Sequence, residues 1–351
     1  MLDTLDPLRH EWRQLAGDAR SVFGTWEWAS TWWRHFGGGR PLLATVSRSA
    51  SGDALAIVPL YLSFRGPLRI VRFVGYGPSD QLGPICAPAA RPVAAQALRA
   101  ALSGRAWRWD IFLGTQIPAD EGWSGLIGGK VLRHHASPVS RFDGASWNEF
   151  LSSRGGGLLK KLRYEERRLA REHELRYRLA DDAERLQADL DTLFALHRAH
   201  WGEGSEFAAQ AAFHREFATC AFARGWLRLW FLELDGRPVA AWYGLRFAGV
   251  ECCYQAGRDP AWDRSSVGFV LLAHSVKTAF EDRMVEYRFL RGGEGYKYRF
   301  ANADPGLETI AFSRGLLGHA ALAGAAAMGG WHPPKITARF RHPDGRAHAE
   351  R

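Results

Sequence analysis

The sequence runs twice through one order of predicted elements, and this repeat limits its possible folds more than any other feature. In each half, three apolar runs typical of strands are followed by a helical pattern and one buried strand. In the first half these are residues 41–47, 54–64, 68–74, 91–103 and 109–113. In the second half they are residues 226–234, 238–247, 250–256, 265–280 and 286–290. We expect strands at 131–139 and 307–312 to close the first and the second unit. One plan used twice indicates a tandem duplication.

A length of 351 residues suits two domains of ordinary size. We predict a first domain over residues 1–145, a basic helical linker over 146–180 and a second domain over 181–315. Residues 316–351 are expected to form a C-terminal helix and a disordered tail, because residues 332–351 are rich in Pro, His and Arg without periodicity.

The composition is that of a globular protein, with 46% hydrophobic and 24% charged residues. The net charge of +9 favours phosphates, anionic sugars or an anionic surface as partners. Four cysteines, two of them adjacent, suit neither a disulfide framework nor a zinc site, so we expect no metal. The N-terminus does not resemble a signal peptide, and residues 316–330 are too short to span a bilayer. We therefore expect a cytoplasmic protein without stable membrane insertion, and the absence of a helix-turn-helix pattern argues against DNA binding.

Two segments are notable for their aromatic and basic side chains. Trp26, Trp28, Trp32 and Trp33 lie at helical spacing in residues 25–36, which predicts core packing or an interdomain wedge; a ligand platform is the alternative. Residues 154–178 form an amphipathic basic helix with apolar leucines on one face. The simpler interpretation is a solvated face, and the alternative is an electropositive lip for an anionic ligand. Its cationic residues are Lys160, Lys161, Arg163, Arg167, Arg168 and Arg171.

Two motifs carry possible chemistry. Arg264, Ser265, Ser266 and Gly268 follow a strand and open a helix, where free backbone amides bind phosphate; an ordinary serine N-cap is the simpler alternative. Residues 289–297 run from an apolar strand into a glycine-rich stretch that ends in Glu294, Tyr296 and Lys297. Charged groups at a strand's carboxyl end can take and donate protons, whereas the alternative is a surface ion pair between Glu294 and Lys297.

Taken in order, these segments resemble the GNAT acyltransferase superfamily. In detail they resemble its CelD/BcsL branch, the cellulose-biosynthesis-associated acetyltransferases with a BioF-like acetyltransferase domain, which are related to the FemAB aminoacyl transferases. The resemblance spans residues 25–313. It rests on Phe73-Val74-Gly75 with Ser79-Asp80, the basic helix from Ser153 to Leu169, Leu196-His197 with Trp201, residues 232–241, Tyr254 to Pro260, Ser266 to Leu272 and Phe289 to Lys297.

The resemblance implies an α/β (α+β) chain of two tandem GNAT-like folds, each a mixed, mostly antiparallel sheet flanked by helices. It implies an enzyme that moves an acyl group, expected to be acetyl, from an acyl-CoA co-substrate to an acceptor. The expected acceptor is an amine or hydroxyl of a sugar, a polysaccharide precursor or a related small molecule.

The resemblance also implies roles for single residues. Arg264, Ser265, Ser266 and Gly268 would bind the donor. Glu294 would deprotonate the acceptor, Tyr296 would protonate the leaving thiolate, and Lys297 and Arg291 would stabilise negative charge. Asp80, His197 and Trp201 would line the acceptor side, although packing is the simpler role for His197 and a turn the simpler role for Asp80.

Two alternative functions stay open. The usual GNAT pyrophosphate signature is Gln/Arg-x-x-Gly-x-Gly/Ala, whereas here the first glycine, Gly268, comes one residue late and the second is missing. FemAB-type proteins also depart at this point, and they use aminoacyl-tRNA, so one alternative is an aminoacyl-tRNA-dependent transferase. The other is a non-catalytic accessory protein of exopolysaccharide or cellulose biosynthesis.

Overall fold

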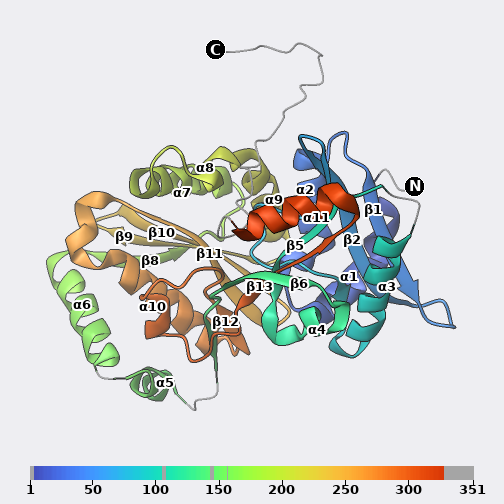
Figure 1. Ribbon diagram of the computed structural model, residues 1–351. Coiled ribbons are helices and arrows are strands. Elements are labelled where there is room, and N and C mark those ends of the chain that lie inside the picture. Colours follow the sequence, from blue (N-terminus) through green and yellow to red (C-terminus); the bar gives the residue numbers. More distant parts are fainter. Residues whose placement is uncertain (1–3, 105–107, 143–145, 156, 328–351) are drawn as a thin grey trace, which may run out of the picture.

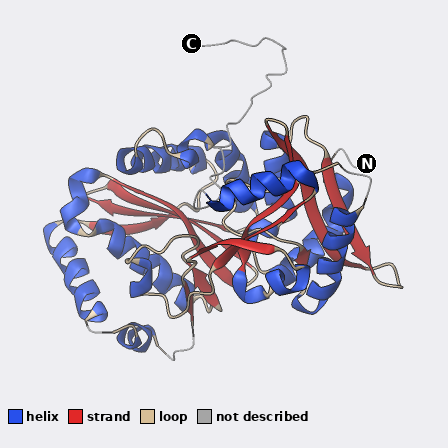
Figure 2. Ribbon diagram, in the orientation of Figure 1, coloured by secondary structure: helices blue, strands red, loops and turns tan. Residues whose placement is uncertain are grey.

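The protein is a mixed α/β molecule with two sheets, each flanked by helices (Figures 1 and 2). It is seen here in a computed structural model that describes residues 4–104, 108–142, 146–155 and 157–327. The C-terminal helix expected after residue 315 is α11, Gly315–Ala327. The tail predicted over residues 332–351 lies outside the described residues.

The first sheet has the strand order β1-β2-β3-β5-β13-β6, with β4 paired to β2. Strands β1, β2 and β3 are antiparallel neighbours, whereas β3 and β5 are parallel and are joined by helix α3. The elements of this unit are β1 Leu42–Arg48, β2 Ala54–Arg65, β3 Leu68–Phe73, β4 Ile85–Cys86, α3 Arg91–Ser103, β5 Ile111–Pro118, α4 Trp123–Ile127, β6 Lys130–His135 and β13 Leu307–Ser313.

The second sheet has the order β7-β12-β11-β10-β9-β8 and repeats the plan. Strands β9, β10 and β11 are antiparallel neighbours, and β11 and β12 are parallel and joined by helix α10. The elements are β7 Val139–Arg141, β8 Leu175–Leu179, β9 Leu227–Leu234, β10 Arg237–Phe247, β11 Val250–Arg258, α10 Val267–Glu281 and β12 Glu286–Arg288. Three antiparallel strands, a crossover helix and a parallel strand therefore occur in both units.

The closing strands differ from the prediction. The segment expected as one strand at 131–139 splits, so that β6 stays in the first sheet and β7 pairs with β12 in the second. The strand expected to close the second unit, β13, lies between β5 and β6 in the first sheet. Hydrophobic patterns show that a strand is buried, but they do not show which edge it pairs with. The domain boundaries after residues 145, 180 and 315 stay predictions.

Helices cover both faces of the second sheet. Helix α10 packs on one face together with α5 and α6, whereas α7 and α9 pack on the other (Figure 1). The predicted linker is more than a helix, because it ends in β8, which pairs with β9. The remaining helices are α1 Arg9–Ala19, α2 Trp26–Phe36, α5 Trp147–Ser153, α6 Leu158–Glu172, α7 Leu186–Trp201, α8 Glu206–Ala209 and α9 Ala211–Ala223. Short 3-10 turns lie at Asp6–Leu8, Val22–Gly24, Pro88–Ala90, Ala119–Glu121, Pro260–Ser265 and Lys297–Arg299.

One hydrophobic core joins the two units, and helix α2 lies at its centre. The Trp28 ring packs against Phe213 and Phe217 of α9, with ring centroids 5.1 and 4.6 Å apart, and against Tyr254 of β11, with centroids 5.7 Å apart. Trp28 and Trp32 are completely buried. Trp28 therefore acts as a wedge between the units, whereas Trp32 packs within the first unit against Phe36 and Tyr61. Burial excludes both rings as an open ligand platform.

Candidate functional site

The candidate site lies where β11 and β12 separate. The two strands pair over three positions, from Val250 opposite Glu286 to Cys252 opposite Arg288. Strand β11 then continues to Arg258, whereas β12 ends and the chain turns away through left-handed backbone at Leu290 and Gly292. The backbone of β11 is thereby left without β12 beside it over the second half of the strand.

Lys297 fixes the loop that follows β12. Its ammonium donates hydrogen bonds to the carbonyls of Arg291 and Gly292 at 2.7 and 3.3 Å and pairs with the Glu294 carboxylate at 2.9 Å. The Lys297 side chain is only 5% exposed, whereas that of Glu294 is 55% exposed. Gly292 has a φ of 116°, a backbone conformation that favours glycine, and the Glu294 carboxylate lies beside its Cα. The pair is therefore more than a surface ion pair, because one partner is buried and holds backbone.

Asp80 reaches the same loop from the first unit. Its carboxylate lies 3.7 Å from the Arg291 guanidinium, and its side chain is mostly buried. Two hydrogen bonds fix the residues before it: Trp28 Nε1 donates to Ser79 Oγ at 2.7 Å, and the Tyr254 hydroxyl donates to the Pro78 carbonyl at 2.6 Å. The structure thus brings together four predicted residues from two distant segments, namely Asp80 from one and Arg291, Glu294 and Lys297 from the other. We call these four residues the junction cluster.

The two carboxylates of the junction cluster differ in their affinity for protons. Burial raises the pKa of Asp80 above its ordinary value, against the opposing charges of Arg291 and Lys297. Burial also acts to raise the pKa of Glu294, but the hydrogen bond from Lys297 and the charges of Lys297 and Arg291 outweigh it, so this pKa is lowered. Burial raises the pKa of the Tyr296 phenol, and the nearby Cys253 and Glu294 act in the same direction. Asp80 is therefore the better proton acceptor, and Tyr296 stays protonated.

The predicted donor-binding residues lie at the start of α10. Ser266 is the residue before the helix, in left-handed conformation, and its side chain makes no capping hydrogen bond. The simpler interpretation as a serine N-cap is therefore wrong, and the first-turn amides of α10 have no serine capping them. Lys161 of α6 and Arg299 lie 5.6 and 5.4 Å from the ring of Phe269 in this first turn. Positive charge thus lies beside a helix start that no side chain caps.

His197 and Trp201 hold the free half of β11 from α7. His197 Nδ1 and Trp201 Nε1 both lie 3.0 Å from the Ala256 carbonyl oxygen. Because that oxygen can only accept, His197 Nδ1 carries the proton and Nε2 accepts from Ser205 Oγ at 2.6 Å. A Cβ atom on Gly257 would collide with the His197 backbone, which shows how closely α7 approaches the strand. His197 is engaged in packing, whereas the Trp201 ring is 61% exposed.

The described residues offer neither a metal site nor a membrane span. They contain no group of three or more His, Cys, Asp or Glu side chains arranged to hold a metal ion. Within the same ranges, every helix is too short or too polar to cross a membrane.

Comparison with known proteins places this site in a known type of domain. Residues 157–298 match the family model of the acetyltransferase (GNAT) domain. These residues contain β8 to β12, α10 and three of the four residues of the junction cluster. No match was found among curated proteins.

Solved structures share the fold at low sequence identity. FemX is 10% identical and has a TM-score of 0.61, with 87% of this chain and 94% of that chain covered. The C-terminal DUF2156 domain of an Agrobacterium fabrum protein, which carries the name of a lysylphosphatidylglycerol synthetase, is 14% identical with a TM-score of 0.57, covering 93% and 96%. L-PGS from Bacillus licheniformis is 11% identical with a TM-score of 0.50, covering 82% and 89%. The narrower resemblance to the cellulose-associated branch stays a prediction. The second unit is thus similar to a GNAT acetyltransferase domain, within a fold of two tandem units that share one plan.

Proposed function

We propose that the protein transfers an acyl group, expected to be acetyl, from acyl-CoA to an amine or hydroxyl of a saccharide or related small molecule. The observation that carries this proposal is the separation of β11 from β12. The uncapped start of α10 lies past the carboxyl end of β11, and the junction cluster follows the carboxyl end of β12.

The donor would lie along the free half of β11. Amides at the start of α10 would bind its pyrophosphate, and glycine at position 268 would allow close approach. Arg264, Ser265, Ser266 and Gly268 keep their predicted role. Lys161 and Arg299 add positive charge at this helix end. Backbone amides of β11 would hold the thioester carbonyl and stabilise the charge that develops on its oxygen.

The junction cluster would handle the acceptor. The acceptor nitrogen or oxygen attacks the thioester carbonyl carbon, the new bond to carbon forms, and the carbon–sulfur bond breaks. We assign the proton released by the acceptor to Asp80, since its pKa is raised, and the proton taken up by the leaving thiolate to Tyr296. Glu294 and Lys297 hold the loop, and Arg291 orients Asp80. This assignment moves the predicted base from Glu294 to Asp80.

Donor binding is tested by thermal unfolding with acetyl-CoA. At about 100 times its dissociation constant, acetyl-CoA should stabilise the folded protein by about 2.7 kcal/mol, which raises the melting temperature by several degrees. Arg264→Ala should remove most of this increase, whereas Arg237→Ala, a matched exposed arginine in the β9–β10 turn, should keep it. If neither acetyl-CoA nor any other acyl-CoA raises the melting temperature, the donor assignment is wrong.

The base is tested by comparing Asp80→Asn with Glu294→Gln. Asp80→Asn should lower turnover by about two orders of magnitude, because the proton acceptor is removed. Wild-type turnover should fall as pH falls through the raised pKa of Asp80. Glu294→Gln should keep this pH profile with a smaller loss of rate. A larger loss in Glu294→Gln than in Asp80→Asn would return the role of base to Glu294.

Helix α6 favours a second candidate, an aminoacyl-tRNA-dependent transferase. Its exposed cations Lys160, Arg163 and Arg167 line a cavity on the outer face of the helix. Lys161 of the same helix lies beside Phe269 at the start of α10. Binding of tRNA that weakens steeply with salt, together with loss of binding in Arg163→Glu, would favour this donor over acyl-CoA. Binding of an assembly partner without turnover of any acyl donor would instead favour the accessory-protein hypothesis.

A further inference from the structure

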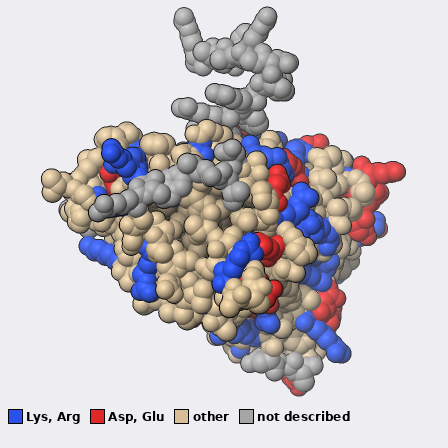
Figure 3. Space-filling model, turned by 90° about the vertical axis from the view of Figure 1, so that its right-hand side faces the viewer, with Lys and Arg blue, Asp and Glu red and all other residues tan. Residues whose placement is uncertain are grey.

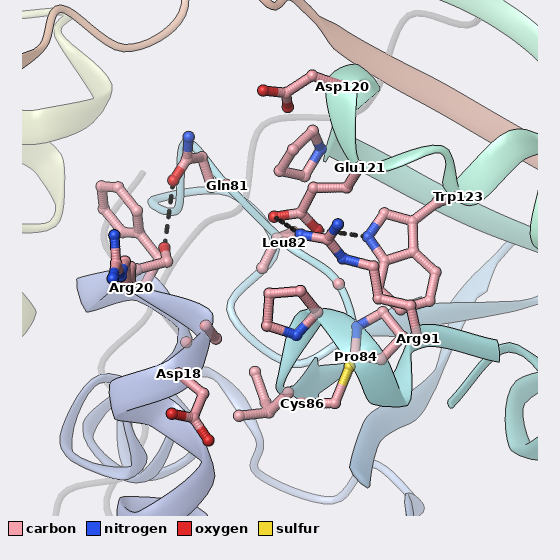
Figure 4. A pocket seen from close by; sticks show the side chains of 18 of the residues that line it. Asp18, Arg20, Gln81, Leu82, Pro84, Cys86, Arg91, Asp120, Glu121 and Trp123 are labelled. Carbon is pink, nitrogen blue, oxygen red and sulfur yellow. Dashed lines mark hydrogen bonds and ion pairs between the residues drawn. The ribbon is translucent and has the colours of Figure 1, made fainter. Parts of the chain in front are cut away.

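A separate cavity of about 620 Å³ lies between the first unit and strands β7 and β12 at one edge of the second sheet. Figure 4 shows Gln81 on one side of it and Arg91, Glu121 and Trp123 on the other. Its size is within the range of small-molecule sites. None of the residues predicted to bind donor or acceptor lines it.

The cavity opens on the face of the second sheet that is opposite α10. The Tyr287 hydroxyl contacts Ser275 of α10, whereas the neighbouring Arg288 donates to Gln81 Oε1 at 2.8 Å and to the Arg20 carbonyl at 3.1 Å. Successive side chains in a strand point to opposite faces, so Arg288 lines the cavity from the face that α10 does not cover. A molecule in this cavity would approach the β11–β12 separation from the side away from the donor.

The cavity lining includes residues that are close in the chain to the junction cluster. Gln81 follows Asp80 directly in the chain, and Arg288 comes shortly before Arg291 in the segment after β12. The hydrogen bond between Gln81 and Arg288 thus joins, in the cavity wall, two residues that lie close in the chain to Asp80 and Arg291.

The lining is polar and most of its charges are paired, while the exposed Asp18 and Arg20 add one charge of each sign. Glu121 accepts from Trp123 Nε1 at 2.6 Å and pairs with Arg91 at 3.3 Å. Arg288 pairs with Glu286 at 2.6 Å, and Asp120 pairs with Arg141 at 3.4 Å. Paired charges give no net field for a phosphate or carboxylate, but they offer donors and acceptors to hydroxyl groups. Pro59, Pro84 and Pro118 add apolar surface against which the C–H face of a sugar ring can pack.

We propose that this cavity binds an uncharged, hydroxyl-rich acceptor of saccharide type and directs its reactive hydroxyl or amine toward Asp80. The direction of transfer rests on the proposed function, whereas binding in the cavity does not. Large residues at the wall should therefore block saccharides without affecting the donor.

The test uses the whole protein and ligand-observed NMR with glucose, N-acetylglucosamine and glucose 6-phosphate. A Cβ atom on Gly83 meets only Trp123 Nε1, at 4.0 Å, so Gly83→Leu should fold and fill the cavity. Gly38→Leu is the matched control, because Gly38 also has open space around it and lies outside the cavity. Glucose or N-acetylglucosamine should bind the wild type and Gly38→Leu, and about tenfold more weakly to Gly83→Leu. Gln81→Leu should also weaken sugar binding. Its control is Gln187→Leu, at an exposed position of α7 outside the cavity, which should leave sugar binding unchanged.

Two results would overturn the inference. One is that neither neutral sugar binds, or that Gly83→Leu and Gln81→Leu bind the sugars as tightly as the wild type does. The other is tighter binding of glucose 6-phosphate than of glucose, which would point to an anionic ligand. The acetyl-CoA melting shift, measured on the same samples, separates the two proposals. A shift without saccharide binding contradicts only the cavity assignment, and saccharide binding without a shift contradicts only the donor.

Discussion

At the scale of single residues, burial decides how the titratable groups of this protein behave. His214 of α9 is completely buried, and its ring centroid lies 4.4 and 5.6 Å from those of Phe207 and Tyr254. Burial lowers its pKa to about 3, and the charges of His197 and His35 act in the same direction. The folded protein therefore holds His214 neutral at pH values where an unfolded chain would bind a proton.

This histidine should make the fold sensitive to acid. Its pKa lies below its ordinary value of 6.5, so the unfolded state binds the extra proton as pH falls from 6.5 toward 3. The free energy of unfolding should drop by about 1.4 kcal/mol per pH unit from this residue in that range. His214→Phe should flatten the dependence in urea titrations at several pH values. His134→Phe, at an exposed position, should leave it unchanged, and an unchanged slope in His214→Phe would contradict the argument.

Lys297 shows what residue patterns could and could not predict. The glycine-rich stretch before it predicted a functional loop, and its charge predicted contact with an anion. The sequence gives no sign that this lysine is buried against backbone carbonyls, because that depends on how the loop folds back after Leu290. The hydrogen bond from Trp28 to Ser79, which fixes the residues before Asp80, joins segments far apart in the chain and was likewise missed.

At the scale of elements, the segment Gly75–Asp80 links the two units at the site. Gly75 has a φ of 103°, and a Cβ atom there would lie 2.7 Å from Ser79 Oγ. Ser79 itself donates to the Gly75 carbonyl at 2.8 Å and accepts from Trp28. The turn is thus closed by contacts that leave no room for a side chain at position 75.

Substitution of Gly75 should cost more than backbone strain alone. Gly75→Ala adds a steric clash to the unfavourable φ and should destabilise the fold by roughly 2 kcal/mol more than Gly52→Ala. Gly52 has a similar φ of 93°, but nothing lies within 4 Å of a Cβ atom there. Equilibrium unfolding in urea measures both. Equal losses in the two variants would show that the turn adapts to the methyl group.

Elements with a complete local pattern were predicted well. Helix α3 has its predicted bounds, and β2, β3, β9 and β10 begin and end close to theirs, because each carries a clear apolar run and a turn signal. Strand β8 was hidden in the basic linker, because Arg176 and Arg178 alternate with its apolar residues and resemble the helix before it. Arg178 is bound by Asp189 and Glu233 at 2.8 and 2.7 Å, contacts that only the folded chain provides.

At the scale of the whole molecule, the exchange of β7 and β13 ties the units together. Strand β7 follows β6 of the first sheet in the chain but belongs to the second sheet, and β13 follows β12 of the second sheet but belongs to the first.

The surface charges of the first unit are mixed in sign. Figure 3 shows cationic and anionic side chains interspersed on the face of the first unit, so the net charge of +9 does not form a single positive surface there.

The exchange predicts that the first unit does not fold alone. A fragment of residues 1–142 lacks β13, which leaves β5 and β6 without the strand between them. Its circular dichroism should show no cooperative melting, and a peptide of residues 305–327 added in trans should restore it. The full chain should unfold in one transition. Cooperative melting of residues 1–142 alone would contradict this dependence.

The position of β13 also sets the order of folding during synthesis. The ribosome makes β5 and β6 early, yet the strand that separates them is among the last elements to emerge. The nascent first sheet therefore has unpaired strand edges while residues 136–306 are translated, although proteins commonly fold their N-terminal part first. The first sheet is thus completed only after the second unit has been made, and during that interval its strand edges are exposed to pairing with other chains.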